Sequence, residues 1–299
     1  MRLRVALKRI RGLASGKLHH YAFQKIFRHQ LAREWIASKV AKGRPKLATD
    51  DLSEREFADA ERLSNDGYVG LDGIITAQQI TEIKDYLQGK LCYDRNRPQH
   101  TARFLPREAP VGTHIAAYTD TDTVNCPHVL QLANNEHILR IVRTYFNCQP
   151  TISNLSIWWS LPTDEEPEEA ENFHRDMDDW RQLKLFIYLT DVTDGFGPHV
   201  FVKESHRIRR ALKIRRYSDE EIVDIFDAQR IVTFYGPQGT CFLENTFGFH
   251  KGTAARIGDR LLLQVLYSLN PLGVSDYQPA SKRHSTDQFD PYVNRLYIR

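Results

Sequence analysis

The sequence of 299 residues is poor in the features that mark several classes of protein. No run approaches the roughly 18 uninterrupted apolar residues of a membrane-spanning helix, and lysine and arginine interrupt the first 16 residues too often for a secretory signal. With only 16 glycines and 13 prolines, the chain is neither collagen-like nor of low complexity. The four cysteines lie far apart without a CxxC pair, which favours reduced thiols and a cytoplasmic location.

Charge is distributed unevenly along the chain. Residues 1–46 hold thirteen lysines and arginines and one acid, so this segment carries +12 in a chain of +3, and the remainder carries −9. Apolar residues recur on one face of a helix over 3–14, and a second stripe consists of Phe23, Ile26, Phe27, Leu31 and Trp35. We therefore expect a basic amphipathic helical extension over residues 1–50. It could cap the body with its basic face in solvent, contact the anionic inner face of a membrane, or grip nucleic-acid phosphates.

The remainder, residues 51–299, has a mixed pattern of helices and short strands. An apolar run at 68–71 precedes a helix expected over 76–87, and another helix is expected over 129–146. Beyond residue 150, short apolar runs alternate with turn signals, at 152–160, 183–189, 199–202, 231–235, 240–243 and 260–267. Many short strands at this spacing indicate an antiparallel barrel or sandwich.

Residues in this β-rich part have the chemistry of a metal site. In an extended segment His174 and Asp176 point to the same face, and His250 offers a second imidazole from a distant strand. Two imidazoles and one carboxylate leave three coordination positions, which suits Fe(II) with a bidentate 2-oxo acid and O2. Arg260 opens an apolar strand, where a buried arginine is costly unless an anion neutralises it. We expect Arg260 to bind the far carboxylate of 2-oxoglutarate.

The order of these motifs resembles the phytanoyl-CoA dioxygenase family. The similar segments are His174-Arg-Asp176, LKLFIYLTDV (183–192), the run from Gly197 to Arg207, and then His250 and Arg260; DGYVGLDG (66–73) resembles the entry to the domain. The resemblance covers about residues 64–270. It implies a mainly β fold with flanking helices around a double-stranded β-helix, a jelly-roll or cupin-like core at about 150–270. It also implies Fe(II) held by His174, Asp176 and His250, with 2-oxoglutarate on Arg260.

The sequence departs from the family pattern at two places. Lys203-Glu204 replaces the first two residues of the usual Pro-Gly-Ser-His turn, and Gly252 stands where a serine or threonine is common, with Thr253 following. Arg256 is a weaker rival to Arg260. We expect auxiliary contacts to 2-oxoglutarate from Thr253 and Lys184, and a substrate pocket formed by Phe186, Trp159 and Arg175. His199 and His206 are expected in turns.

The acidic loop Glu165–Glu171 has two readings: it keeps the protein in solution, or it is a mobile lid over the iron. Asp176 fills the position that related halogenating enzymes leave to chloride. The sequence therefore predicts a dioxygenase that hydroxylates a C–H bond of a small-molecule, lipid or glycolipid substrate and releases succinate and CO2. The alternatives are a nucleic-acid- or membrane-binding protein with a catalytically silent barrel, and a metal isomerase of the same fold. The acidic body disfavours nucleic acid.

Overall fold

The computed structural model describes residues 24, 27, 29–46, 52–97, 99–208, 213–272 and 288–298. The helix expected over residues 3–14, and Phe23 and Ile26 of the second stripe, lie outside these residues. Among the described helices, none combines the length and the apolar character needed to cross a bilayer.

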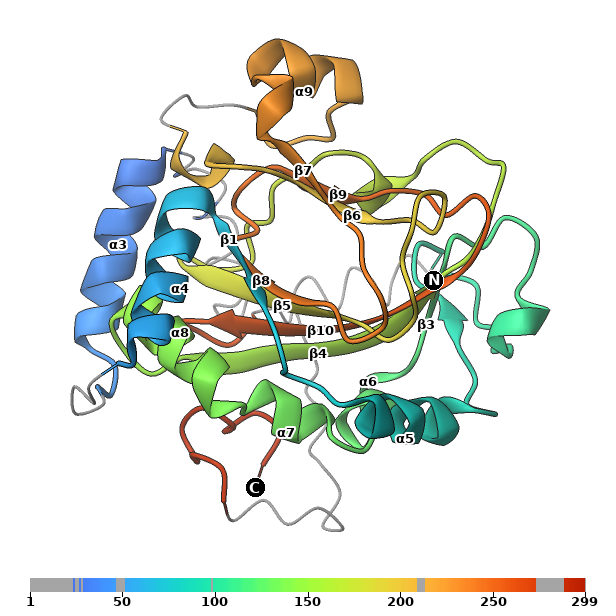
Figure 1. Ribbon diagram of the computed structural model, residues 1–299, viewed down its shortest axis with the longest axis horizontal. Helices are drawn as coiled ribbons and strands as arrows, with labels where there is room; N and C mark the ends of the chain where they lie inside the picture. The colour runs from blue at the N-terminus through green and yellow to red at the C-terminus, as the bar shows by residue number, and fades with distance from the viewer. Residues whose placement is uncertain are drawn as a thin grey trace, which may run out of the picture.

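Two antiparallel sheets face one another at the centre of the molecule (Figure 1). The larger has the order β1 (Tyr68–Leu71), β8 (Cys241–Glu244), β5 (Gln182–Tyr188), β10 (Arg260–Ser268), β4 (Thr151–Ser160), β3 (Ile115–Ala117) and β2 (Tyr93–Asp94). The smaller has the order β7 (Ile231–Phe234), β6 (His199–Val202) and β9 (His250–Gly252). The expected fold is confirmed: a mainly β protein with a double-stranded β-helix core and flanking helices.

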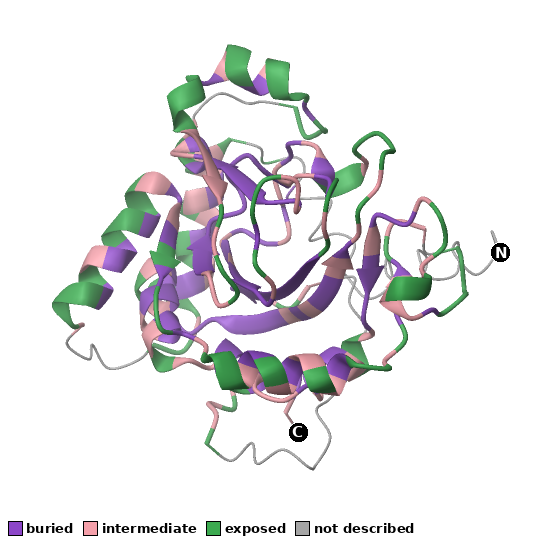
Figure 2. Ribbon diagram, turned by 45° about the vertical axis from the view of Figure 1, so that its right-hand side comes forward, coloured by how far each residue is buried: buried purple, intermediate pink, exposed green. Residues whose placement is uncertain are grey.

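The central strands β4, β5 and β10 are long because their sequences are almost continuously apolar, as strands covered on both faces require. All nine residues of β10 are buried. Alternation sends Leu261, Leu263 and Val265 into the core beneath the larger sheet, whereas Arg260 and Gln264 face the cavity between the sheets. The burial colouring in Figure 2 shows the same purple interior under green outer surfaces.

Helices cover the outer face of the larger sheet: α4 (Glu54–Asp66), α5 (Ala77–Leu87), α6 (Asp120–Val124), α7 (Val129–Ala133) and α8 (Glu136–Phe146). Helix α9 (Asp219–Ile225) lies beyond the smaller sheet. The 3-10 turns are η1 (Pro106–Glu108), η2 (Glu169–Glu171), η3 (Ser205–Arg207) and η4 (Ala228–Arg230). The single helix expected over 129–146 is wrong: Asn134 ends α7, and the Asn135 side chain caps α8 by accepting from Ile138 N.

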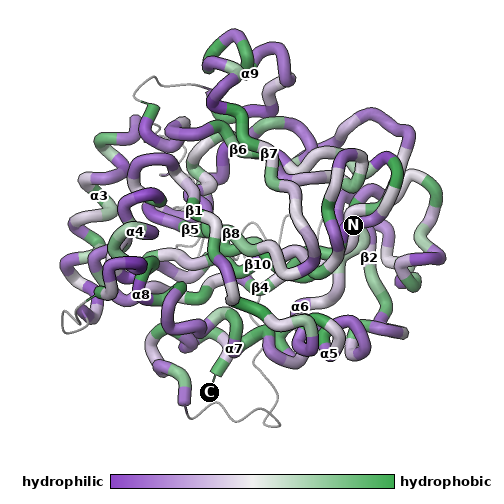
Figure 3. The backbone as a smooth tube through the Cα atoms, viewed as in Figure 1, coloured by the Kyte–Doolittle hydropathy of each residue, from purple (hydrophilic) through white to green (hydrophobic). Residues whose placement is uncertain are grey.

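Helix α3 (Gln30–Lys42) presents the face opposite to the predicted one. Leu31 and Trp35 of the apolar stripe are 56% and 65% exposed, whereas Arg33 is 3% exposed. Arg33 Nη2 donates to Asp179 O at 2.5 Å, and its guanidinium lies 5.4 Å from the ring centre of Trp180. The helix thus packs on the body as the cap interpretation requires, but Arg33 shares the inward face with Ala37 and Ala41, and Leu31 and Trp35 of the expected stripe face outward. The hydropathy colouring along α3 in Figure 3 is accordingly mixed.

Candidate functional site

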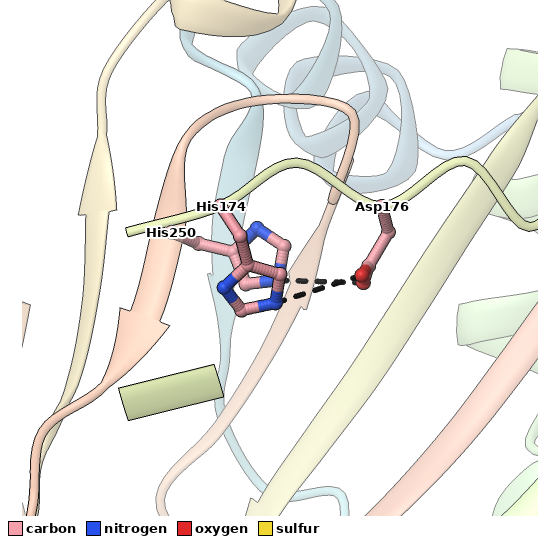
Figure 4. Close-up of side chains that lie close together, drawn as sticks. All are labelled: His174, Asp176 and His250. Atoms are coloured by element: carbon pink, nitrogen blue, oxygen red, sulfur yellow. Dashed lines mark ion pairs between the residues drawn. The ribbon is translucent and has the colours of Figure 1, made fainter. Parts of the chain in front are cut away.

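Backbone pairing brings the three expected metal ligands together. His174 and Asp176 lie in the extended segment after η2, and His250 is the first residue of β9. His174 and His250 exchange two backbone hydrogen bonds, of 2.9 and 3.0 Å, and Asp176 N donates to Thr246 O at 2.8 Å. Because this ladder fixes all three Cα positions, the three side chains converge on one point (Figure 4).

The two imidazoles turn the same nitrogen toward the carboxylate. His174 Nε2 lies 3.6 Å from Asp176 Oδ1, and His250 Nε2 lies 3.3 Å from Oδ2. Each Nδ1 lies 3.0 Å from a carbonyl oxygen, of Asn172 and Gly248 respectively, so each Nδ1 carries the proton and donates. Each Nε2 is therefore the nitrogen that points toward the carboxylate and could coordinate an ion, and backbone carbonyls orient metal-binding histidines in this way.

The donor set suits a divalent transition metal. One ligand atom from each of the three residues lies within 4.8 Å of the others, and both imidazoles are buried. Burial, reinforced by the charge of His250, holds the pKa of His174 well below its usual value, so this imidazole is neutral near pH 7. Burial opposes the charge on His250, but the neighbouring Asp176 raises the pKa of this imidazole, so a bound cation would have to displace its proton. Two imidazoles and one carboxylate on one side of an ion are the facial arrangement of non-haem Fe(II) sites.

Lys184 of β5 contacts the same carboxylate. Its Nζ lies 2.5 Å from Asp176 Oδ2 and 3.3 Å from Asp178 Oδ2. Burial disfavours this ammonium, but the two carboxylates raise its pKa above the usual value. Lys184 was expected to contact 2-oxoglutarate; it lines the cavity, where it neutralises the Asp176 carboxylate.

Arg260 is a buried cation without a counter-ion in the described part of the chain. Its Nη1 donates to Gly197 O and its Nη2 to Ser160 Oγ at 3.0 Å, whereas Nε has no partner. No carboxylate of the described residues lies within 4.0 Å of the guanidinium, and burial lowers its pKa. A side chain at Gly252 would meet Arg260 Nη2 at 3.1 Å, so the glycine that departs from the family pattern makes room for the arginine.

The three ligands and Arg260 open into one cavity of about 510 Å³ between the sheets. Its wall is polar near the ligands and aromatic at Trp158 and Phe186. Thr253 also lines the cavity, and its hydroxyl donates to Pro198 O at 2.9 Å. Thr253, Phe186 and Lys184 are thus brought to the site by the fold.

Trp159 and Arg175 are not at this cavity. Trp159 lies on the opposite face of β4, against the main core, where its Nε1 donates to Tyr118 Oη at 2.9 Å; its neighbour Trp158 faces the cavity. Arg175 points away from the two ligands beside it, donates to Phe247 O at 2.6 Å and stacks on that ring. Alternation along the strand explains both placements. Arg256 is exposed and donates to Thr163 O and Glu165 O.

Two histidines expected in turns are buried. His199 begins β6, lines the cavity and places Nε2 2.8 Å from Glu244 Oε2. Burial raises the pKa of Glu244 to about 8. The alternation of Glu244 with Phe242 in a buried strand was the available signal for this pair. His206 does lie in the turn η3, yet it is buried and its Nε2 donates to Ser64 O at 3.1 Å; burial lowers its pKa to about 4.

Hydrogen bonds tie the acidic loop to neighbouring segments of the protein. Arg97 donates to both oxygens of Glu168 at 3.2 Å, and His114 Nδ1 lies 2.7 Å from Glu171 Oε2. Both glutamates line the cavity. These contacts give the loop a structural connection to the site beyond the solubility that its composition suggests.

No family model matches the chain, and no curated protein matches its sequence. Solved structures do resemble it. EctD from S. alaskensis, crystallised with 2-oxoglutarate and 5-hydroxyectoine, superposes with a TM-score of 0.54 at 17% identity, over 85% of this chain and 88% of that one. HygX from Streptomyces hygroscopicus, with nickel and 2-oxoglutarate, gives 0.54 at 15%, over 82% and 97%. The non-heme alpha ketoglutarate dependent carbocyclase SnoK from nogalamycin biosynthesis gives 0.52 at 15%, over 83% and 95%. The chain therefore shares the fold of these proteins.

Proposed function

We propose that this protein is an Fe(II)- and 2-oxoglutarate-dependent dioxygenase that hydroxylates a C–H bond of a small molecule. The observation that carries the proposal is the pairing of two features in one cavity. One is the His174–Asp176–His250 triad, in which both imidazoles are buried and turn Nε2 toward the carboxylate; the other is Arg260, buried without a carboxylate partner in the described chain. A metal isomerase of the same fold would need the first feature but not the second.

Each residue has a distinct task in this proposal. His174, Asp176 and His250 would hold Fe(II), and Arg260 would bind the distal carboxylate of 2-oxoglutarate, with Ser160 and Thr253 beside it. Bound Fe(II) and 2-oxoglutarate would supply the activation of O2, with succinate and CO2 as co-products. The chain orients the co-substrate, keeps the Asp176 carboxylate ionised through Lys184, and excludes water from the buried end of the cavity.

Hydroxylation is the preferred reaction for two reasons. Asp176 occupies the third protein position, so no site is reserved for a halide. In addition, one structure with this fold is bound to a hydroxylated compound, 5-hydroxyectoine. SnoK is described as a carbocyclase, so the fold accommodates other oxidations, and the substrate has to be identified by experiment.

An anaerobic titration tests the proposal. Fe(II) and 2-oxoglutarate are added to the protein, and the weak metal-to-ligand charge-transfer band is followed in the visible. We expect the band in the wild type and in His100→Ala, which replaces an exposed histidine outside the cavity. His174→Ala should lose the band together with the iron, and Arg260→Ala should need far more 2-oxoglutarate. Wild-type protein that binds iron but gives no band would refute the proposal and favour the isomerase.

The outer face of α3 supports a second proposal, that the protein docks on an anionic membrane surface. Leu31 and Trp35 project outward one helical turn apart, and Lys39 and Lys42 follow them, with Lys39 Nζ 5.6 Å from the Trp35 ring centre. Outward apolar and aromatic residues beside lysines are typical of interfacial helices. The charge of +12 over residues 1–46 would attract anionic headgroups and bring the cavity close to lipid-linked substrates.

A further inference from the structure

The carboxylates on the cavity wall, other than the ligand Asp176, are all paired inside the chain. Glu168 is bound by Arg97 at 3.2 Å, Glu169 by Arg216 at 3.1 Å, Glu171 by His114 at 2.7 Å, and Asp178 by Lys184 at 3.3 Å. Each of these carboxylates therefore has a partner in the chain, with Lys184 shared between Asp176 and Asp178, and none of them is left without one for a cationic substrate.

The cations of the wall are matched in the same way, with two exceptions. Lys184 and Arg216 have carboxylate partners. Arg260 has none, and the proposed function assigns it to 2-oxoglutarate. Arg95 is the other exception: among the described residues, no carboxylate lies within 4.0 Å of its guanidinium. Its charge does lower the pKa of Asp120, which burial raises, but Asp120 lies beyond ion-pair distance and outside the cavity wall.

An aromatic platform positions Arg95 at the cavity. Its guanidinium carbon lies 4.9 Å from the ring centre of Trp158, a side chain that is only 8% exposed. Stacking on a ring holds a guanidinium flat and leaves its N–H edge available to an acceptor. Arg95 is also close enough to Lys184 to lower the pKa of that ammonium. The exposed head of Arg95 therefore faces the space next to the ligands and can be reached from solvent.

The same face of β4 joins the two unmatched arginines. Trp158 and Ser160 are two residues apart, so both point into the cavity; Trp158 carries Arg95, and Ser160 contacts Arg260. The cavity thus holds two separate anion-binding groups along one strand. One of them is buried and suits the co-substrate, and the other is open.

We propose that Arg95, held on Trp158, binds an anionic group of the substrate, either a carboxylate or a phosphate ester. This inference rests on the proposed function, because it takes the cavity as the place where the substrate is oxidised. Guanidinium binds both oxyanions through two parallel N–H···O bonds, which fixes the orientation of the bound molecule as well as its affinity. The substrate would be an anion that extends from Arg95 toward the ligand triad.

Paired compounds test the inference. Succinate formation is measured with a panel of small carboxylic acids, each matched with its methyl ester, and of sugar phosphates, each matched with the free sugar. We expect stimulation above the substrate-free rate only by anionic members, and the carboxylate and phosphate arms identify the group. Arg95→Gln should raise the KM for the best anion tenfold to a hundredfold, the usual loss for a charged hydrogen bond.

Two variants serve as controls. Arg103→Gln removes another exposed arginine that stacks on a ring, 4.7 Å from the centre of Tyr93, but lies outside the cavity, so it should behave as wild type. Arg95→Lys keeps the charge and should recover part of the affinity. The charge-transfer band is recorded first: its absence would refute the proposed function itself. With the band present, anionic compounds that do no better than their neutral partners, or no response from the whole panel, would overturn the role of Arg95.

Discussion

Replacing Arg260 with glutamine separates the role of this residue in binding from any role in folding. Arg260 is 3% exposed; among the described residues its guanidinium donates to Gly197 O and Ser160 Oγ and lies 5.9 Å from the ring centre of Tyr188. A buried cation without a counter-ion is costly, so its removal should not lower the free energy of unfolding of the ligand-free protein by more than about 1 kcal/mol. A structural ion pair would behave differently, since breaking one costs about 3 to 5 kcal/mol.

The ligand-bound protein should respond differently. A co-substrate at 100 times its Kd stabilises the folded state by about 2.7 kcal/mol. Losing the charged contacts of Arg260 should weaken 2-oxoglutarate about a hundredfold, since each charged hydrogen bond contributes about 1.5 to 3 kcal/mol. At the same concentration the variant would then be half-saturated and gain only about 0.4 kcal/mol.

Thermal unfolding with anaerobic Fe(II), with and without 2-oxoglutarate, measures both quantities. We expect the melting temperature of the wild type to rise by several degrees with 2-oxoglutarate and that of Arg260→Gln to remain almost unchanged. Arg256→Gln is the matched control, because Arg256 is exposed, lies four residues earlier and donates to the loop carbonyls of Thr163 and Glu165. Equal protection of Arg260→Gln and the wild type would show that 2-oxoglutarate does not bind at this arginine.

Three further predictions concern other parts of the molecule. Burial holds the pKa of His206 at about 4, against 6.5 in the unfolded chain, so on acidification the unfolded chain binds a proton at this imidazole before the folded protein does. The free energy of unfolding should therefore fall by up to about 3 kcal/mol from pH 6.5 to 4. His206→Gln should make this pH dependence, measured by urea titrations, less steep. The double variant Leu31→Ser, Trp35→Ser should no longer sediment with anionic vesicles. Leu91→Ser, at another exposed leucine outside α3, should still sediment; unchanged sedimentation of the double variant would exclude α3 as the membrane contact. Arg97→Ala should speed proteolysis within Glu165–Glu171, and no change would show that the Glu168 contacts do not hold the loop.

The long strands were predictable from the sequence because a strand buried on both faces is a nearly continuous apolar run. The apolar runs at 152–160 and 260–267 end within one residue of β4 and β10. The break between α7 and α8 was missed because Asn134-Asn135 interrupts a hydrophobic pattern that continues on both sides. A cap signal inside a periodic run has to be given more weight than the periodicity.

At the site, the residues that share a strand segment or carry an unusual charge could be found, and those defined by distant partners could not. Residue type and sequence neighbours were enough to predict His174, Asp176, His250 and Arg260, and the fold brings these residues to one cavity. The choice between Trp158 and Trp159 depends on the phase of the pleat, which the sequence of two adjacent tryptophans does not reveal.

The orientation of α3 was wrong for the same reason. Hydrophobic periodicity assumes that an arginine faces water, but Arg33 finds a backbone carbonyl at Asp179, 146 residues away along the chain. Such an acceptor appears only when the chain is folded.

The position of Arg33 also bears on how the arm and the barrel are related. Its guanidinium lies between Trp180 and Phe247, at 5.4 and 4.7 Å from their ring centres, and those two residues belong to the loops that continue from Asp176 and lead into His250. Helix α3 therefore contacts, through Arg33, both of the loops that carry the expected metal ligands. A chain that starts at residue 51 would keep His174, Asp176 and His250 but lose the contacts of Arg33 with Trp180 and Phe247. The change in composition near residue 50 separates a basic segment from an acidic one, but the basic segment takes part in the packing around the site.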